Sequence, residues 1–204
     1  MKKKKIIYLI NMSKKEEEEE KKIFKIITVG DSNVGKSSII RRYIYGDFKD
    51  DMMTTVGLNF SLKEITLSNG ATINLKIVDT AGQEKYRSLT KSYFKNSDGV
   101  LFVFSLEEKK SFENINEWIK IFEENNNRNK IPKYLIGNKS DLDNEITQNM
   151  IDEFLNEHAE FKYEKTSALK NENIEKLFKD ICEDIWINFI NTYQEEQKTI
   201  LIKK

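Results

Sequence analysis

The chain has very few cysteines: Cys182 is the only one among its 204 residues. A single cysteine excludes an internal disulfide and is consistent with a reducing compartment such as the cytosol. The chain also lacks an excess of charge of either sign, because 34 basic residues balance 34 acidic ones. A strongly basic surface is therefore not indicated, and we expect no nucleic-acid partner.

Long apolar stretches are missing as well, since none approaches the roughly 20 residues that span a bilayer. Residues 1–10 place lysines before a short apolar segment. That segment is too short for a signal peptide, and no small-residue cleavage site follows it. We expect residues 1–22 to form a disordered charged tail. A basic arm that contacts membranes is the alternative, and translation from Met12 would leave only residues 13–22 of the tail.

The most informative segment is residues 30–37, Gly-Asp-Ser-Asn-Val-Gly-Lys-Ser, which matches the G-x-x-x-x-G-K-[ST] phosphate loop in full. An apolar run at 23–29 precedes it and predicts a buried strand, and residues 38–43 predict a helix. The loop therefore lies between the two elements that it requires. A glycine-containing turn before an ordinary helix is the alternative interpretation.

The chemistry of this loop is that of an anion site. Gly30 and Gly35 allow backbone N–H groups to converge on anionic oxygens, and the helix N-terminus adds its partial positive charge. We expect Lys36 to contact terminal phosphates through its ammonium group and Ser37 to bind Mg²⁺ through its hydroxyl.

Strand and helix patterns alternate along the rest of the chain. Strands are predicted at 23–29, 58–67, 72–78, 99–104, 133–137 and 161–166, and further helices at about 111–124, 147–158 and 173–193. An Asn-Gly signal at residues 69–70 predicts an antiparallel hairpin. The pattern predicts an α/β fold, a doubly wound and mostly parallel six-stranded sheet with one antiparallel hairpin strand and helices on both faces.

Residues 79–84, Asp-Thr-Ala-Gly-Gln-Glu, directly follow the strand predicted at 72–78. A carboxylate at the end of a strand can hold Mg²⁺ directly or through a water, which makes Asp79 a candidate ligand. Gly82 permits a backbone N–H to approach a terminal phosphate closely. Gln83 can orient an attacking water. Taken alone, the segment also fits an ordinary turn.

Two further loops carry candidate base contacts. Residues 138–141, Asn-Lys-Ser-Asp, contain a carboxylate, Asp141, which can accept hydrogen bonds from two adjacent N–H donors. Guanine presents such a pair and adenine does not, so we expect Asp141 to select the base. Lys139 can lay its aliphatic stem along the ring. In residues 166–169, Thr-Ser-Ala-Leu, a small residue can offer a backbone N–H to the base. A helix-capping loop is the alternative for 138–141.

In this order, each after a successive strand, the segments resemble the phosphate, Mg²⁺ and guanine motifs of the Ras-superfamily small GTPases, most closely those of the Rab family. The resemblance covers about residues 23–191. It implies a P-loop small G domain at 23–193, with a short C-terminal tail at 194–204. It also implies an enzyme that binds GTP or GDP with Mg²⁺ and hydrolyses GTP to GDP as a molecular switch in vesicle and membrane trafficking.

The resemblance also implies roles for single residues. Phe48 resembles the aromatic residue beside the guanine ring, and Thr55 resembles a Mg²⁺ ligand of the GTP state. The implied nucleotide contacts are Asp31, Ser32, Asn33, Val34, Gly35, Lys36, Ser37, Ser38, Phe48, Thr55, Gly82, Asn138, Lys139, Asp141, Ser167, Ala168 and Leu169. The implied metal ligands are Ser37, Thr55 and Asp79, and the implied catalytic residues are Gln83, Lys36 and Thr55.

Residues 54–57 resemble switch I, residues 86–94 a Rab-type switch II, and residues 56–60 the Rab effector segment. The resemblance implies that an exchange factor, a GTPase-activating protein and effectors bind through 54–60 and 83–94. No arginine is placed like a built-in finger, so we expect slow intrinsic hydrolysis that an activating protein accelerates. We expect a monomer.

The chain departs from the Rab pattern at its C-terminus, where no cysteine is available for prenylation. Met1 is not followed by a glycine for myristoylation either. Cys182 lies inside the last predicted helix, where we expect a buried core role. Membrane association is therefore left open. We expect a cytoplasmic protein, with peripheral association on endomembranes through a partner as the alternative.

Two further departures concern the partner surface. Val78 stands where Rabs usually carry tryptophan, so the apolar effector triad that Phe60 and Tyr93 would complete lacks its indole. Effectors that rely on the indole are expected to bind weakly. Met52 and Met53 precede the switch I threonines and are interpreted either as tolerated surface residues or as an adaptable partner surface.

Other function classes remain as alternatives. A GTP-binding scaffold with little turnover, or a Ran-like soluble switch, fits the missing lipid site and Val78. A phosphate-loop kinase or ATPase is disfavoured by Asp141 and by the absence of an evident lid. Helical spacing places Trp118 and Trp186 in the core, and His158 has no companion at metal-ligand spacing.

Overall fold

The computed structural model describes residues 22–49, 58–80, 92–128 and 130–202, with side chains described up to residue 195. Within these residues the strands are β1 (Ile23–Val29), β2 (Leu58–Thr66), β3 (Thr72–Thr80), β4 (Gly99–Ser105), β5 (Lys133–Asn138) and β6 (Phe161–Lys165). The helices are α2 (Lys36–Tyr45), α4 (Lys109–Glu113), α5 (Ile115–Asn125), α6 (Gln148–Glu157) and α7 (Ile174–Ile202).

The described strands form one six-stranded sheet in the order β2-β3-β1-β4-β5-β6. Only β2 and β3 pair antiparallel, and every other neighbouring pair is parallel. The Asn-Gly turn joins the antiparallel pair. There Gly70 has a φ of 87°, and the Asn69 side chain accepts a hydrogen bond from the Ala71 N–H at 3.0 Å. The predicted fold class and hairpin are confirmed.

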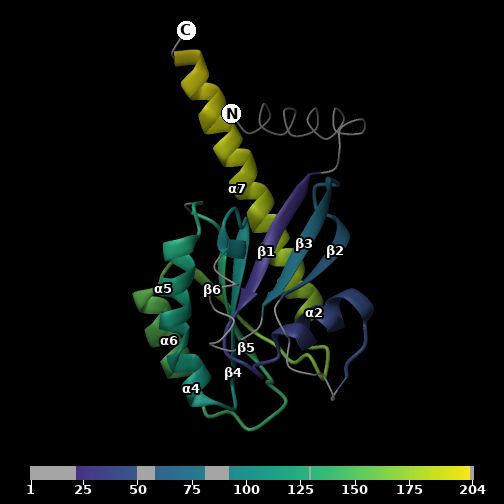
Figure 1. Cartoon of the computed structure of the whole chain (residues 1–204), viewed down its shortest axis with the longest axis vertical. Coiled ribbons are helices and arrows are strands. Elements are labelled where there is room, and N and C mark those ends of the chain that lie inside the picture. The colour runs from purple at the N-terminus through teal and green to yellow at the C-terminus, as the bar shows by residue number, and fades with distance from the viewer. Residues whose placement is uncertain (1–21, 50–57, 81–91, 129, 203–204) are drawn as a thin grey trace.

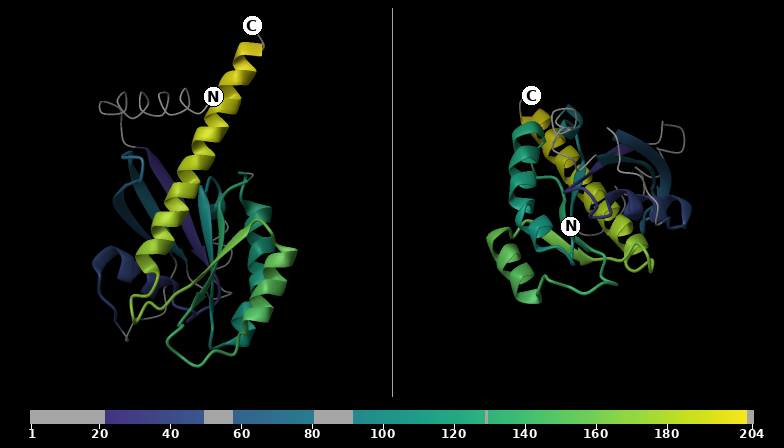
Figure 2. Two further views of the ribbon diagram at one scale, coloured as in Figure 1. Left: turned by 180° about the vertical axis from the view of Figure 1, so that it is seen from behind. Right: turned by 60° about the horizontal axis from the view of Figure 1, so that its bottom comes forward.

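Helices cover both faces of the sheet (Figures 1 and 2), and an apolar core lies between the helices and each face. On one face α2 and α7 pack on β1 and β3, and on the other α5 and α6 pack on β4 and β5. All seven residues of β4 are buried, because a parallel central strand is covered on both sides. Trp118 and Trp186 lie in these two cores as predicted.

The structure corrects two predicted helices. The helix predicted at 111–124 is divided into α4 and α5, with the break at Asn114. The apolar periodicity continues across the break, so it could not reveal it. The helix predicted to end near residue 193 continues to Ile202. Residues 194–198, Gln-Glu-Glu-Gln-Lys, are all strong helix formers with no glycine or proline among them. In Figure 1 the yellow end of α7 extends beyond the sheet.

Cys182 lies inside α7 and is fully buried, as predicted. Burial, with a smaller contribution from the charge of Glu183, raises the pKa of its thiol to about 12. Among the described helices, none combines the length and the apolar character needed to cross a membrane.

Candidate functional site

The predicted motifs come together at one edge of the sheet. The phosphate loop follows β1, Asp79 lies at the end of β3, and residues 138–141 begin at the last residue of β5. Residues 166–169 follow β6. Because β1, β4, β5 and β6 are parallel, their carboxyl ends share this edge, which is where open α/β sheets bind ligands.

The backbone of the phosphate loop depends on two glycines. Gly30 has a φ of 143°, and a Cβ there would lie 2.0 Å from the carbonyl oxygen of Val103 in β4. Gly35 has a φ of 93°, and its Cβ would lie 2.2 Å from Nδ2 of Asn138. Any larger residue would clash and would also be strained at these φ values. The loop is therefore packed directly against β4 and against the predicted base motif.

Lys36 begins α2 and is only 5% exposed. Its ammonium donates to the carbonyl oxygens of Gly30 at 2.9 Å and Asp31 at 2.6 Å. Burial lowers the pKa of Lys36 to about 8, although the charges of Asp79 and Asp31 act in the opposite direction. A buried cation held by two carbonyls is well suited to a further anion, because an added negative charge offsets its loss of hydration.

The candidate Mg²⁺ ligands that the structure describes lie next to one another. The Ser37 hydroxyl donates to Oδ2 of Asp79 at 2.5 Å, and Asp79 is buried. A hydroxyl and a carboxylate are oxygen donors of the kind that Mg²⁺ prefers. In the same loop, the Ser32 hydroxyl oxygen is buried and has no hydrogen-bond partner among the described residues. These features fit a phosphate with its magnesium ion.

Asn138 connects three of the predicted motifs. Its side chain is buried, with 1% of its surface exposed. Its Nδ2 donates to the carbonyl oxygen of Val34 at 2.9 Å. Its Oδ1 accepts from the Thr166 hydroxyl at 3.2 Å and from the Ala168 N–H at 3.3 Å. The phosphate loop and the two candidate base loops are thus tied together by one amide.

The other two candidate base residues of this loop have polar partners within the chain. Asp141 accepts a hydrogen bond from the Ser167 hydroxyl. Lys139 has a left-handed backbone, with a φ of 63°, and its ammonium forms an ion pair with Glu107. Neither partner could be identified from the sequence pattern, because each comes from a loop after a different strand.

Several sequence-predicted residues lie outside the described residues. They are Thr55, Gly82 and Gln83, together with residues 54–57 and most of the segment 83–94. Of the remaining predicted contacts, Phe48 is partly buried against the core, Val34 and Ala168 are buried, and Leu169 is exposed. All of the predicted nucleotide contacts, including those of Asp31, Ser32, Asn33 and Ser38, remain predictions.

Sequence reasoning missed the residues that hold Asp31. Its Oδ2 accepts from the Asn114 amide at 2.6 Å, and its Oδ1 accepts from the Trp118 indole N–H at 2.8 Å. The side chain therefore points toward the α4–α5 junction. Helical spacing marked Trp118 as a core residue, but spacing does not reveal which acceptor a buried indole N–H meets.

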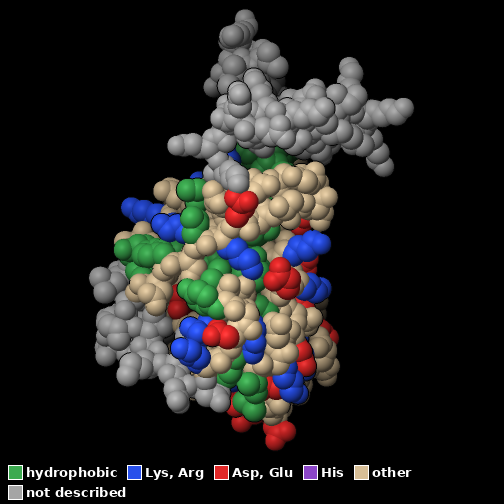
Figure 3. Space-filling model, turned by 90° about the vertical axis from the view of Figure 1, so that its right-hand side faces the viewer, with side chains coloured by type: hydrophobic (Ala, Val, Ile, Leu, Met, Phe, Trp, Pro, Cys, Tyr) green, Lys and Arg blue, Asp and Glu red, His purple; other side chains and the backbone are tan. Residues whose placement is uncertain are grey.

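Part of the predicted effector surface, including Phe60, Val78 and Tyr93, lies within the described residues. The rings of Phe60 and Tyr93 lie 5.6 Å apart, and Phe60 is 49% exposed. Val78 lies opposite Phe60 in the β2–β3 register and is fully buried. The Lys76 ammonium sits 4.7 Å from the centre of the Phe60 ring. Figure 3, which faces the side where β2 lies, shows exposed hydrophobic side chains next to lysine or arginine side chains.

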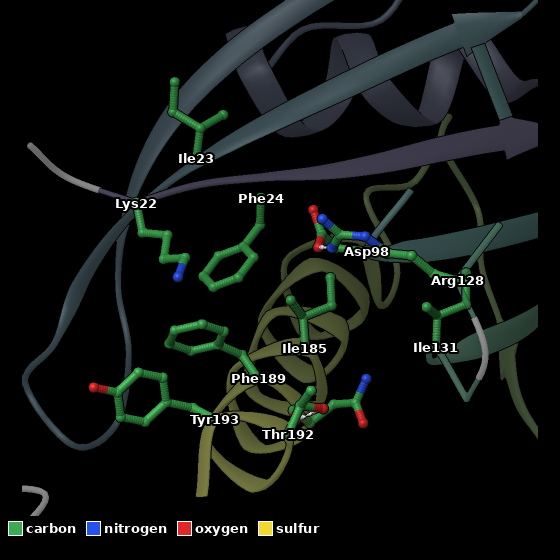
Figure 4. A pocket seen from close by; sticks show the side chains of 11 residues that line it. Lys22, Ile23, Phe24, Asp98, Arg128, Ile131, Ile185, Phe189, Thr192 and Tyr193 are labelled. Atoms are coloured by element: carbon green, nitrogen blue, oxygen red, sulfur yellow. Dashed lines mark hydrogen bonds and ion pairs between the residues drawn. The ribbon is translucent and has the colours of Figure 1, made fainter. Parts of the chain in front are cut away.

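A cavity of about 510 Å³ lies at the opposite edge of the sheet (Figure 4). Its lining includes Phe24 at the start of β1, Asp98 just before β4, and Phe189 of α7. Asp98 forms an ion pair with Arg128, and Lys22 lies over the Phe189 ring. None of the predicted motif residues lines this cavity, so we place the candidate function at the other edge.

Comparison with known proteins agrees with this geometry. The family model described as Ras family matches residues 25–187. The chain is 36% identical over 185 residues to Ras-related protein RAB1BV of Beta vulgaris, covering 89% of this chain and 85% of the relative. It is 37% identical over 180 residues to Ras-related protein Rab-11B of Dictyostelium discoideum, covering 87% and 78%. It is 36% identical over 165 residues to Ras-related protein Rab-10 of Diplobatis ommata, covering 80% and 81%.

Proposed function

Because the chain belongs to the Ras family and within it is a Rab-like small GTPase, we propose that it binds GTP and GDP with Mg²⁺ and hydrolyses GTP as a molecular switch in membrane trafficking. The observation that carries the proposal is the Asn138 amide, which ties the phosphate loop to both candidate base loops. Such a connection suits one ligand that has phosphates at one end and a base at the other.

The phosphates would lie in the loop of residues 30–37. Backbone N–H groups and the N-terminus of α2 would face the phosphates there, and Lys36 supplies a buried positive charge. Ser37, Asp79 and, in the GTP state, Thr55 would hold Mg²⁺, which when bound neutralises charge on the phosphates. Asp31, Ser32, Asn33, Val34, Gly35 and Ser38 complete the proposed phosphate contacts.

The base would lie between Phe48 and Lys139, with the Asp141 carboxylate accepting from two N–H groups of guanine. In the described structure Asp141 accepts from the Ser167 hydroxyl, which keeps the carboxylate oriented. Ser167, Ala168 and Leu169 would approach the base from the other side. Adenine offers no matching donor pair, and it would leave the half-buried Asp141 carboxylate without its partners.

Hydrolysis would rest on positioning and charge stabilisation. Gln83 would orient the attacking water, and Lys36 would stabilise charge that develops on the phosphate oxygens. Gly82 and Thr55 would link the state of the nucleotide to residues 54–60 and 83–94. An exchange factor, an activating protein and effectors would bind there, with Phe60 and Tyr93 exposed for contact. We place the protein in the cytoplasm, with recruitment to endomembranes through a partner.

The decisive experiment combines single-turnover hydrolysis of GTP with a competition between GTP and ATP, both in the presence of Mg²⁺. We expect strong preference for guanine and slow hydrolysis that Gln83→Leu slows further while GTP binding persists. Equal binding of ATP would overturn the base assignment. Guanine binding with no turnover in either protein would show a nucleotide-binding scaffold instead.

A further inference from the structure

Arg42, in the last turn of α2, connects two segments that lie far apart in the sequence. Its Nε donates to the carbonyl oxygen of Ala168 at 2.8 Å, and its Nη2 donates to that of Leu169 at 2.9 Å. Its Nη1 donates to the carbonyl oxygen of Gly46 at 2.8 Å. One guanidinium thus joins the end of α2 to the loop after β6.

The Ala168 residue is held on both sides of its backbone. Its N–H donates to Oδ1 of the buried Asn138 side chain, and its carbonyl oxygen accepts from Arg42. Because two different side chains hold its N–H and its C=O, the orientation of this stretch of backbone is set by Asn138 and Arg42 together. Removing Arg42 would leave Asn138 as the remaining anchor of Ala168 among the described contacts.

Arg42 also contacts the aromatic residue proposed to lie beside the base. Its guanidinium carbon lies 5.9 Å from the centre of the Phe48 ring, and Gly46 precedes Phe48 by two residues. At Gly46 the chain turns with a left-handed φ of 71°. The same side chain therefore contacts both sides of the proposed base position, the loop 167–169 and the segment 46–48.

We infer that Arg42 is a positioning residue for guanine binding, which holds Ala168 and Phe48 against the base and so slows the release of nucleotide. The inference rests on the proposed function, because it concerns the same ligand. The planar guanidinium is essential, since it directs three nitrogen donors toward three carbonyl oxygens, and the single nitrogen of an ammonium cannot reproduce that arrangement. Arg42 does not contact the phosphate loop in any described hydrogen bond, so the hydrolysis step should not depend on it.

The test compares the rate at which bound GDP dissociates from the full-length wild type, Arg42→Ala and Arg42→Lys. We expect GDP to leave about tenfold faster from both variants, which is the size expected for the loss of charge-assisted hydrogen bonds that orient a ligand contact. The single-turnover rate constant for GTP hydrolysis should be unchanged. Lys63→Met is the matched control, because Lys63 also donates to a carbonyl near the end of α2, that of Tyr43 at 2.8 Å, and has no contact with residues 167–169 among its described bonds.

Two nucleotide analogues separate positioning of the base from a general loss of structure. Inosine diphosphate keeps the O6 acceptor of guanine and lacks the 2-amino donor, whereas 6-thioguanosine diphosphate keeps the donors and has a weaker acceptor at position 6. If Arg42 acts by orienting the backbone of residues 167–169 beside position 6 of the base, Arg42→Ala should reduce discrimination against the thio analogue and leave discrimination against the inosine analogue unchanged.

The inference is overturned if Arg42→Lys releases GDP at the wild-type rate, because charge alone would then suffice. It is equally overturned if Arg42→Ala weakens GDP and both analogues by the same factor, which is the result of a purely structural role. Tight GDP binding by wild type with no change in either variant would overturn this inference alone. A wild type that does not bind GDP would instead overturn the proposed function on which it rests.

Discussion

At the scale of single residues, the side chains of the site form hydrogen bonds with residues that are distant in the sequence. Asp31 is the clearest case, since its carboxylate is bonded to Asn114 and Trp118 while its carbonyl oxygen holds the Lys36 ammonium. The position of the buried cation therefore depends on a contact made by a tryptophan of α5. This chain of bonds can be tested without touching the phosphate loop itself.

Trp118→Phe removes the indole N–H and keeps an aromatic ring in the core. We expect GDP to dissociate about 5- to 30-fold faster, because the partly buried Asp31 carboxylate loses a hydrogen bond worth about 1–2 kcal/mol. Trp186→Phe is the matched control, since the Trp186 indole nitrogen is buried and has no hydrogen-bond partner among the described residues. Stopped-flow release of a fluorescent GDP analogue measures both. Equal dissociation rates in the two variants would show that the Trp118 hydrogen bond to Asp31 does not affect GDP binding.

Asp141→Asn tests the proposed base contact directly. The amide replaces one of the two acceptors with a donor, so guanine loses a hydrogen bond while xanthine, which carries an oxygen at position 2, gains one. We expect guanine nucleotides to bind at least 100-fold more weakly and xanthine nucleotides to bind more tightly. Competition binding with GDP and xanthosine diphosphate measures the change. An unaltered preference for guanine would remove Asp141 from the base site.

At the scale of elements, the packing of the long C-terminal helix α7 against the sheet determines the reactivity of its one thiol. Cys182 in α7 is fully buried, and its thiol pKa of about 12 means that the reactive thiolate is about a thousandfold rarer at pH 8 than for a thiol with the ordinary value. We expect no reaction of the folded protein with a thiol reagent such as Ellman's reagent within an hour at pH 8. One equivalent should react after unfolding in guanidinium chloride. Rapid labelling of the native protein would show that α7 opens from the core.

The elements also show where sequence patterns succeed and where they stop. Each strand was predictable because apolar runs such as residues 99–104 and the Asn-Gly turn are local signals. The break between α4 and α5 at Asn114 could not be predicted, since the Asn114 side chain forms a hydrogen bond with Asp31, which is 83 residues away. The contacts of Asn138 and Arg42 were hidden for the same reason. The motifs predict which residues would contact the proposed ligand, whereas the residues that hold those contacts in place are set by tertiary contacts that no motif reveals.

At the scale of the whole molecule, the sheet brings four separated segments to one edge, and Asn138 joins three of them: the phosphate loop and the two loops after β5 and β6. A ligand that spans the phosphate loop and the base loops would bind the folded state and not the unfolded chain, and it would therefore raise the unfolding temperature. At a GDP concentration 1,000 times its dissociation constant the gain is about 4 kcal/mol. For a chain of this size that corresponds to a shift of about 10 °C.

We therefore expect GDP with Mg²⁺ to raise the midpoint of thermal unfolding by about 10 °C, and ATP with Mg²⁺ at the same concentration to leave it nearly unchanged. The measurement is differential scanning fluorimetry on protein first freed of nucleotide with a chelator. Guanosine is the matched control, because it has the base without the phosphates and should stabilise far less than GDP if both ends of the site contribute. Stabilisation by ATP equal to that by GDP would mean that the base loops do not select the ligand. Stabilisation by guanosine equal to that by GDP would mean that the phosphate loop contributes nothing to binding.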